Sequence, residues 1–517
     1  SQDVLRQGVI NDVKRHACYI SSKNEFLASL APEGPKRAKS YPPNAPAHWQ
    51  AALGPLTMSN RQAAGVILAA GKGTRMKSDL PKGLHEVCGL PMVEIVGRAM
   101  REAGISPIVV VIGHGGEKVQ SRLGDGYLYA WQTEQHGTGH AMQMAAPLLK
   151  DHVGPVVVAP GDTPLVSSAT FSELISQFED GQQCLVASSV VGEPRGYGRI
   201  VREAGVLKGI VEEKDASPDQ RSIGEVNSAI YCFDAPSLLA ELPKLKNDNA
   251  QGEYYLTDVV ATFAANGKAN AHIFDDSDIL VGVNDRWQLA MADKKLRQRT
   301  LRRHAEAGVT IMDPDTTYLG LEVEIGNDTV LEPNTMIVGK TVVGAGCRLG
   351  PFTRIEDSEI GDRVNIYVSY IKEAKIHDEV KIGPYAHIRP GSELYPGVKI
   401  GNFVETKNAI LEEEVKVSHL SYIGDAHVGE NTNIGAGTIT CNYDGFSKSR
   451  TEIGKDVFIG SNNTLVAPVK VGDGAITAAG SVVTSGEYPS DALVVGRART
   501  EVKEQWAAQW RNKKKSQ

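Results

Sequence analysis

The sequence predicts an α/β domain followed by a parallel β-helix. In the first half of the chain, strand-like runs alternate with amphipathic stretches, as in a mostly parallel sheet covered by helices. In the second half, aliphatic residues recur every six positions, a period that fits neither an α-helix nor a flat strand. Glycine makes up 53 of 517 residues and aromatic residues only 6%, which indicates many tight turns and an aliphatic core.

Composition excludes several classes of protein. With 517 residues the chain is too long for one ordinary domain, and 41% hydrophobic with 23% charged residues is typical of globular proteins. A net charge of −7 gives no broad basic surface, and no apolar run approaches the roughly 20 residues that span a bilayer. We therefore expect neither nucleic acid nor membrane as a partner. The six cysteines are scattered without a CxxC pair, which favours a reducing cytoplasmic location over disulfides or a zinc site.

Residues 1–60 are expected to be a leader, either disordered or non-native. They lack sustained periodicity, and residues 32–55 are rich in proline and alanine. The leader could be an added extension, a mis-assigned start or a transit segment. Its acidic residues argue against a transit segment, since such segments are poor in acids. These residues are Asp3, Asp12, Glu25 and Glu33.

Residues 61–284 form the predicted α/β domain. Its strands are expected at 66–69, 108–112, 156–159, 184–191 and 229–233, with an amphipathic helix at 93–103. Residues 285–308 read as one highly charged helix that Gly308 would end, and a spacer between domains is the simplest interpretation.

Residues 309–499 form the predicted β-helix. The series Ile376, Ile382, Ile388, Leu394 and Ile400 has an unbroken spacing of six, so each side chain would point inward and stack on its copy one coil away. Two segments, 401–422 and 440–450, break this register. They could be plain surface loops, but loops extruded from a solenoid often carry the binding site, and we favour that interpretation. Residues 500–517 predict a docking helix, with Trp506 and Trp510 on one face and a basic, solvated end.

A glycine-rich loop follows the first predicted strand. Residues 68–76 read LAAGKGTRM, and their small residues would let backbone N–H groups approach an anion, with Arg75 and Lys82 adding positive charge. Asp162 follows another apolar strand. It could hold Mg²⁺ together with phosphate oxygens, or it could cap the next helix.

These motifs resemble a known family. LAAGKGTRM, Leu80-Pro81-Lys82 and QHGTGH at 135–140 are similar to the sugar-nucleotide pyrophosphorylases. With the six-residue repeats, residues 61–510 resemble the bifunctional bacterial N-acetylglucosamine-1-phosphate uridylyltransferases/glucosamine-1-phosphate N-acetyltransferases. The most specific stretches are 249–258 and 431–445. The resemblance implies a Rossmann-like nucleotidyltransferase domain, a left-handed parallel β-helix, the substrates UTP and acetyl-CoA, Mg²⁺ as cofactor, and a homotrimer.

The resemblance also implies the residues of a uridylyl-transfer site. Those that would bind the nucleotide are Leu68, Ala69, Ala70, Gly71, Arg75, Lys82, Gln132, Gly137 and Thr138. The sugar would contact Gly198, Glu212 and Asn227, and the metal would be held by Asp162 and Asn284. The sequence departs from the family pattern at Gly83, His136 and Pro160, and we expect these changes to tune affinity without abolishing activity.

The resemblance also implies a second site on the β-helix, with His419 as general base, although a lone histidine is more often structural. A neutral imidazole suits removal of a proton from an attacking amine, and the resemblance assigns that amine to glucosamine-1-phosphate. Glu405 is a candidate to orient the ring. The acetyl acceptor would be bound by Arg389, Lys407, Tyr422, Asn433, Asn442 and Tyr443. Acetyl-CoA would be bound by Ala436, Ser461, Ala479 and Arg497. One edge of a solenoid offers only half a groove, so we expect a neighbouring subunit to complete the site.

The leading hypothesis is therefore one chain with two transferase sites. It would acetylate glucosamine-1-phosphate and then convert the product with UTP into UDP-N-acetylglucosamine and pyrophosphate. One alternative is a related nucleotidyltransferase for another sugar or base. Another is a β-helix that only trimerises the chain, although a purely structural solenoid has no need of His419, Arg389 and Lys407.

Overall fold

The computed structural model describes residues 61–515. The predicted leader, residues 1–60, lies outside the described residues. The described residues, 61–515, belong to one compact unit. Within 61–515, no helix is long and apolar enough to cross a membrane. Five cysteines are free thiols, as expected from their spacing: Cys88, Cys184, Cys232, Cys347 and Cys441.

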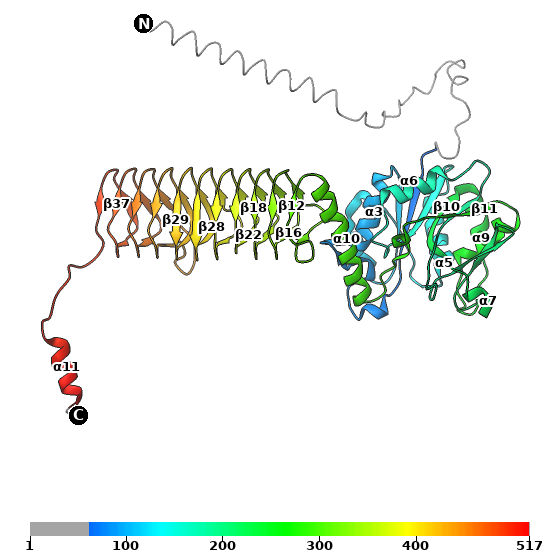
Figure 1. Ribbon diagram of the computed structural model, residues 1–517, viewed down its shortest axis with the longest axis horizontal. Helices are drawn as coiled ribbons and strands as arrows, with labels where there is room; N and C mark the ends of the chain where they lie inside the picture. Colours follow the sequence, from blue (N-terminus) through cyan, green and yellow to red (C-terminus); the bar gives the residue numbers. More distant parts are fainter. Residues whose placement is uncertain (1–60, 516–517) are drawn as a thin grey trace, which may run out of the picture. The chain divides into compact units, whose positions relative to one another are not determined.

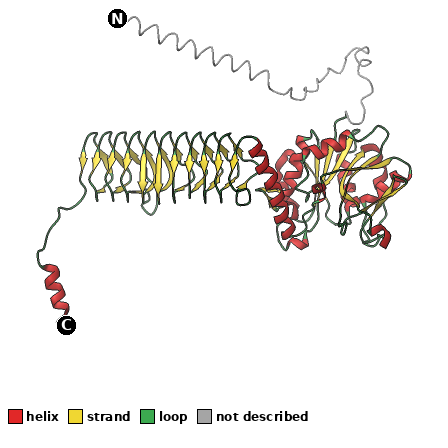
Figure 2. Cartoon of the chain, viewed as in Figure 1, coloured by secondary structure: helices red, strands yellow, loops and turns green. Residues whose placement is uncertain are grey.

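The α/β part combines strands and helices (Figures 1 and 2). It is built on a nine-stranded sheet of order β11-β7-β10-β6-β1-β4-β5, with β8 and β9 attached as a ribbon. Its strands are β1 (Ala64–Ala69), β4 (Ile108–Ile112), β5 (Leu128–Trp131), β6 (Pro155–Pro160), β7 (Cys184–Val190), β8 (Arg199–Glu203), β9 (Val206–Val211), β10 (Glu225–Asp234) and β11 (Ala269–Ile273). The strand predicted at 229–233 belongs to β10, which runs antiparallel to both β6 and β7. An antiparallel direction is possible because the chain reaches β10 from the β8–β9 ribbon. A long crossover connection is needed only between strands that pair in parallel.

Helices cover both faces of this sheet. Helices α3 (Met92–Glu102) and α6 (Ser168–Ser176) pack on one face. Helices α5 (Thr138–Ala145), α8 (Ala235–Glu241) and α9 (Leu256–Ala265) pack on the other. Because both faces are buried, the strands read as continuous apolar runs, and only their ends are open to ligands.

The charged helix α10 (Arg286–Glu306) is more than the predicted spacer. It begins after Asp285, whose side chain accepts a hydrogen bond from Gln288 N at 2.8 Å, and it stops just before Gly308, whose φ is +97°. Ala292 packs with apolar residues of the α/β part, whereas Leu301 belongs to the core of the β-helix. The helix therefore contributes to two separate cores.

The six-residue period forms a parallel β-helix, as predicted. Its short strands run from β12 (Thr310–Ile311) to β40 (Leu493–Val494), and each pairs with a strand on a neighbouring coil. The series from Ile376 to Ile400 is buried in one continuous aliphatic core. The strands around the predicted acetyl site are β25 (His387–Ile388), β27 (Lys399–Asn402), β28 (Glu405–Leu411), β29 (Lys416–His419), β30 (Tyr422–Val428), β31 (Asn433–Ile434), β32 (Ile439–Cys441), β34 (Phe458–Ile459) and β37 (Ile476–Thr477).

The two predicted interruptions differ in kind. Residues 401–422 are not an extruded loop: Ile400 pairs with Val417 and Val417 with Ile434, each 17 residues later, where Ile382 pairs with Ile400 after 18. These coils are one residue shorter than the coil before them, and this phase shift resembles a break in the sequence. Within the second interruption, 440–450, the first two residues still belong to β32, and the segment between β32 and β33 (Thr451–Ile453) leaves the wall, since Ile434 pairs with Ile459 only after 25 residues.

The C-terminal helix α11 (Trp506–Lys515) carries the predicted tryptophan face, with the rings of Trp506 and Trp510 stacked 6.4 Å apart. None of its residues is buried. Docking of this helix, which we predicted, is therefore not seen against the part of the chain that the structure describes.

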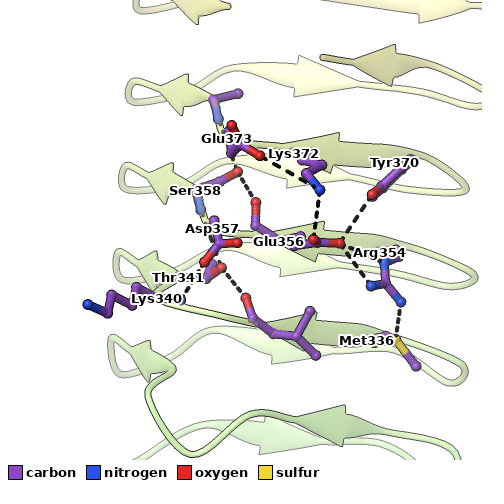
Figure 3. A network of polar contacts seen from close by, with 12 residues as sticks. Met336, Lys340, Thr341, Arg354, Glu356, Asp357, Ser358, Tyr370, Lys372 and Glu373 are labelled. Atoms are coloured by element: carbon purple, nitrogen blue, oxygen red, sulfur yellow. Dashed lines mark hydrogen bonds and ion pairs between the residues drawn. The ribbon is translucent and has the colours of Figure 1, made fainter. Parts of the chain in front are cut away.

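A polar network on the outside of the β-helix joins β19 (Arg354–Glu356) to β22 (Tyr370–Lys372), as Figure 3 shows. The carboxylate of Glu356 accepts hydrogen bonds from Arg354 at 2.8 Å, Lys372 at 3.0 Å and Tyr370 at 3.1 Å. Arg354, followed by Lys372, lowers the pKa of Glu356 from 4.5 to about 2. The ionised carboxylate therefore stabilises the contact between two coils.

We expect Glu356→Gln to lower the free energy of unfolding of the β-helix by about 1 kcal/mol at pH 7, a modest value because Arg354 and Lys372 are partly exposed. Since the pKa in the folded state lies below 4.5, the contribution should be complete above that pH and should fade as the pH falls toward 2. Urea denaturation at several pH values measures it. Glu359→Gln, an exposed glutamate nearby, is the control, and a difference that stays constant down to pH 3 would contradict the assignment.

Candidate functional site

A cavity of about 340 Å³ lies where β1 and β6 end. Most of the predicted nucleotide-binding residues line it together: Leu68, Ala69, Ala70, Gly71, Lys82, Gln132, Gly137 and Thr138. Arg75 lines an adjoining cavity instead. Residues that are distant in the sequence thus converge at the carboxyl edge of the sheet, where open α/β sheets bind ligands.

The far wall of this cavity is held rigidly. Gln132 is buried, and its Nε2 donates a hydrogen bond to Gly137 O at 3.1 Å. Gly137 has a φ of +101°, and a Cβ there would lie 2.6 Å from Tyr254 O, so only glycine fits. The amide of Gln132 and the start of α5 thereby present fixed polar groups to a ligand.

A second cavity of about 500 Å³ shares Thr138, Pro160, Asp162, Ala229 and Tyr231 with the first. The predicted sugar-binding residues Gly198, Glu212 and Asn227 line it.

Polar contacts order the wall of this second cavity. Asn227 Nδ2 donates a hydrogen bond to Tyr231 Oη at 2.8 Å, and Thr257 donates one to Glu212 at 3.3 Å. Burial raises the pKa of Glu212, an effect that the Thr257 hydroxyl only partly opposes. Carboxyl, amide and hydroxyl groups at a cavity wall suit a ligand with many hydroxyls.

Asp162 and Asn284, the predicted metal ligands, meet at one cation. The ammonium of Lys82 donates hydrogen bonds to Asp162 Oδ2 and, at 2.8 Å, to Asn284 Oδ1. Arg75 donates to the same Asn284 oxygen at 2.8 Å, and Val283 N binds Asp162 O at 2.9 Å, which ties the two segments together. Within residues 61–515, no group of three or more His, Cys, Asp or Glu residues could hold a metal. A divalent ion here would need ligand oxygens besides one carboxylate and one amide, which suits an ion bound with phosphates.

The three departures from the family pattern lie in different surroundings. Gly83 is buried, and a Cβ would lie 3.2 Å from Val93 Cβ, so Val93 fills the space of a larger side chain. His136 lies 2.8 Å from Glu134 and is half exposed. Of these three residues, only Pro160 lines both cavities. Their effect on affinity remains a prediction.

Four of the predicted acetyl-site residues lie in one column along a corner of the β-helix. Each follows by two positions an inward-facing residue that pairs with its copy on the next coil. These residues are His419, Ala436, Ser461 and Ala479. Arg497 lies beside Gly480 at the same corner. The parallel register therefore assembles a straight track from residues spread over almost eighty positions.

The orientation of His419 differs from the prediction. Its Nδ1 lies 2.6 Å from Asn402 Oδ1, in the same column, whereas Glu405 forms an ion pair with Arg389 at 2.6 Å. Asn402, rather than Glu405, is thus the residue placed to orient the ring. Sequence reasoning favoured the carboxylate because it is the common partner of a catalytic histidine.

Positive charge gathers on strands of another sheet of the β-helix, the one that contains β25 and β28. Lys407 lies in β28 and Arg389 follows β25. Lys448, from the inserted segment, and then Arg389 lower the pKa of Lys407 through their positive charge. Such mutual repulsion favours a bound anion. Lys448 was not predicted from the sequence. The one feature that could have indicated it is its positive charge within the segment that interrupts the six-residue repeat.

Of the remaining acceptor-site residues, Asn442 is linked to this charge through Asp425. Asn442 donates a hydrogen bond to Asp425, which also accepts one from Asn408 at 2.7 Å. Burial raises the pKa of Asp425, but these hydrogen bonds and the nearby lysines outweigh it, so the net shift is downward. Tyr422 pairs in register with Glu405, Asn433 lies on β31, and Tyr443 is largely exposed.

Several residues that line the two cavities of the α/β part were not predicted from the sequence: Arg195, Tyr197, Tyr231, Glu253 and Thr257. Glu253 and Thr257 lie within the specific stretch 249–258, which was the only signal for them. Arg195 and Tyr197 belong to a loop without a motif.

Comparison with known proteins covers both regions. A MobA-like NTP transferase domain matches residues 65–261, and the bacterial transferase hexapeptide (six repeats) matches residues 322–357 and 450–485. The bifunctional protein GlmU of Heliobacterium modesticaldum is 50% identical over 442 residues, or 85% of this chain and 96% of that protein. Those of Staphylococcus haemolyticus and Carboxydothermus hydrogenoformans are also 50% identical, over 85% and 86% of this chain and 98% and 99% of theirs.

Proposed function

The chain belongs to the family of the bifunctional protein GlmU, and on that premise we propose two linked reactions. The β-helix transfers the acetyl group of acetyl-CoA to glucosamine-1-phosphate. The α/β part then transfers the uridylyl group of UTP to N-acetylglucosamine-1-phosphate, giving UDP-N-acetylglucosamine and pyrophosphate. The observation that carries this proposal is the 50% identity over 442 residues, a stretch longer than either half of the chain.

For uridylyl transfer, the adjoining cavities would hold nucleotide and sugar phosphate on either side of Asp162. A phosphate oxygen of the sugar attacks the α-phosphorus of UTP, and pyrophosphate leaves. Both reactants are anions, so Lys82 and Arg75 would screen their repulsion and hold them in line. Asp162 and Asn284 would hold Mg²⁺, which supplies further neutralisation of the phosphates when bound.

For acetyl transfer, Arg389, Lys407 and Lys448 would bind the sugar phosphate. His419 would take a proton from the amine as its nitrogen attacks the thioester carbonyl, and the sulfur leaves as the thiol of CoA. Asn402 Oδ1 would accept the Nδ1–H hydrogen bond and leave Nε2 free as the base.

We propose a homotrimer because this second site lies on a convex corner, which cannot enclose a ligand alone.

An apolar ridge (Phe352, Tyr385, Phe403 and Leu420) runs along the same corner next to the His419 column. These side chains are 54–65% exposed, and all four have left-handed backbones with φ between +49° and +59°. Each such residue costs roughly 1–2 kcal/mol that glycine would avoid. On later coils the same position holds Gly437, Asn462 and Gly480. Copies of the chain would pack along the ridge and separate where it ends, leaving a slot for acetyl-CoA.

The two reactions are tested together by mass spectrometry of products from glucosamine-1-phosphate, acetyl-CoA, UTP and Mg²⁺. UDP-N-acetylglucosamine is expected. Failure of both acetylation and uridylylation with these substrates would exclude the substrate assignment.

We expect His419→Ala to reduce acetyl transfer roughly 10²- to 10⁴-fold and to leave uridylyl transfer unchanged. Asn402→Ala should lower kcat of acetyl transfer and change its pH profile, because the ring loses the acceptor that fixes its tautomer. Glu405→Gln should instead raise KM for the sugar phosphate, because it frees Arg389. Assays of the two reactions in parallel measure these effects. Equal loss of both activities in His419→Ala, with the oligomer intact, would refute the two-site assignment.

We expect Phe403→Glu to convert the oligomer into monomers, because it places a charge within the apolar ridge beside Tyr385, with which Phe403 stacks at 5.3 Å. Acetyl transfer should be lost while uridylyl transfer persists. Light scattering coupled to size-exclusion chromatography measures the mass. Phe446→Glu, the same change at an exposed residue off the ridge, is the control. An unchanged oligomer for Phe403→Glu would rule out the ridge as the interface.

A further inference from the structure

Lys82 occupies an unexpected position for a residue assigned to nucleotide phosphates. Its ammonium binds the side-chain oxygens of both Asp162 and Asn284, the residues predicted to share a divalent ion. One cation therefore already bridges the two oxygens. This inference rests on the proposed function, which assigns the metal to the same pair.

The position of Lys82 is fixed from several sides. A Cβ on Gly73 would lie 2.7 Å from Lys82 Cβ, so the glycine loop packs directly on the lysine stem. Lys82 opens the short 3₁₀ helix Lys82–Leu84, whose buried Gly83 lies against Val93. The side chains of Lys82 and Asp162 are only 17% and 25% exposed, so solvent screens their attraction poorly.

The target oxygens are held as well. Asn284 Nδ2 donates a hydrogen bond to Gly282 O at 3.3 Å, and Asn284 N donates one to Gln288 Oε1 at 2.7 Å. These contacts leave Oδ1 of Asn284 facing Lys82. A divalent ion placed between the same oxygens would meet the ammonium at contact distance, and like charges that close repel strongly.

We propose that Lys82 acts as an internal substitute for the divalent cation in the nucleotide-free protein. Lys82 also lines the cavity of the glycine loop, where a triphosphate would offer it stronger partners. Movement of the ammonium toward the phosphates releases Asp162 and Asn284. Lys82 thereby couples metal binding to nucleotide binding and keeps the pair neutralised when neither is bound.

The test is Mn²⁺ binding to the full chain without nucleotide, measured from the free-ion signal in electron paramagnetic resonance. We expect Lys82→Met to bind Mn²⁺ at least tenfold more tightly than the unmodified protein, because the cation that contacts both oxygens is gone and Arg75 contacts only that of Asn284. Lys72→Met is the matched control: Lys72 is exposed in the same loop, and no bond of the described structure joins it to either oxygen. Its Mn²⁺ affinity should match that of the unmodified protein.

Equal or weaker Mn²⁺ binding by Lys82→Met would overturn the proposal, provided that Lys82→Gln, a second neutral variant, behaves alike. Adding Asp162→Asn to Lys82→Met should abolish the gain. If the unmodified protein with UTP binds no more Mn²⁺ than Asp162→Asn with UTP, the metal site itself is wrong, and the proposed function fails at that point. A metal site that works with UTP but is indifferent to Lys82 refutes only the substitution.

Discussion

The stacking of one aliphatic side chain on the next inside the β-helix determines which residues meet on its outside. Because Val417, Ile434 and Ile459 follow one another in register, His419, Ala436 and Ser461 must also align. The positions of these outward-facing residues relative to one another are therefore fixed by the pairing of the strands that carry them. The inward-facing residues stay paired although the coil length varies from 16 to 25 residues, so the differences in length fall between them.

In each candidate site, one cation forms an ion pair before any substrate arrives. Lys82 binds Asp162, and Arg389 binds Glu405. A buried or half-buried cation without a partner would be costly, so a site built for phosphates needs counter-charges that can be displaced. Lys407 and Lys448 differ from these cations, since they lie close together and repel one another. That pair is the part of the β-helix most in need of an anion.

Periodicity and small-residue motifs predicted the main architecture. The apolar runs gave the strands of the sheet, the spacing of six gave the β-helix, and the motifs named residues that converge on two adjoining cavities. Pairing direction was not predictable for β10, because a strand's direction depends on the connection before it and not on its composition. The 17-residue coils and the Asn402 contact also escaped prediction. Both depend on how neighbouring coils align, which a single sequence records only indirectly.

The two cores that share α10 have a consequence for how the chain can be divided. Ala292 and Leu301, nine positions apart on one helix, are buried in different halves. Arg98 and Glu322 add an ion pair at 3.0 Å across the same junction. If the chain were cut at either end of α10, the fragment without this helix would expose apolar core residues that the helix now buries. Helix α10, which reads in the sequence as a simple spacer, is therefore part of both cores. Each half of the chain can be isolated intact only if both fragments include this helix.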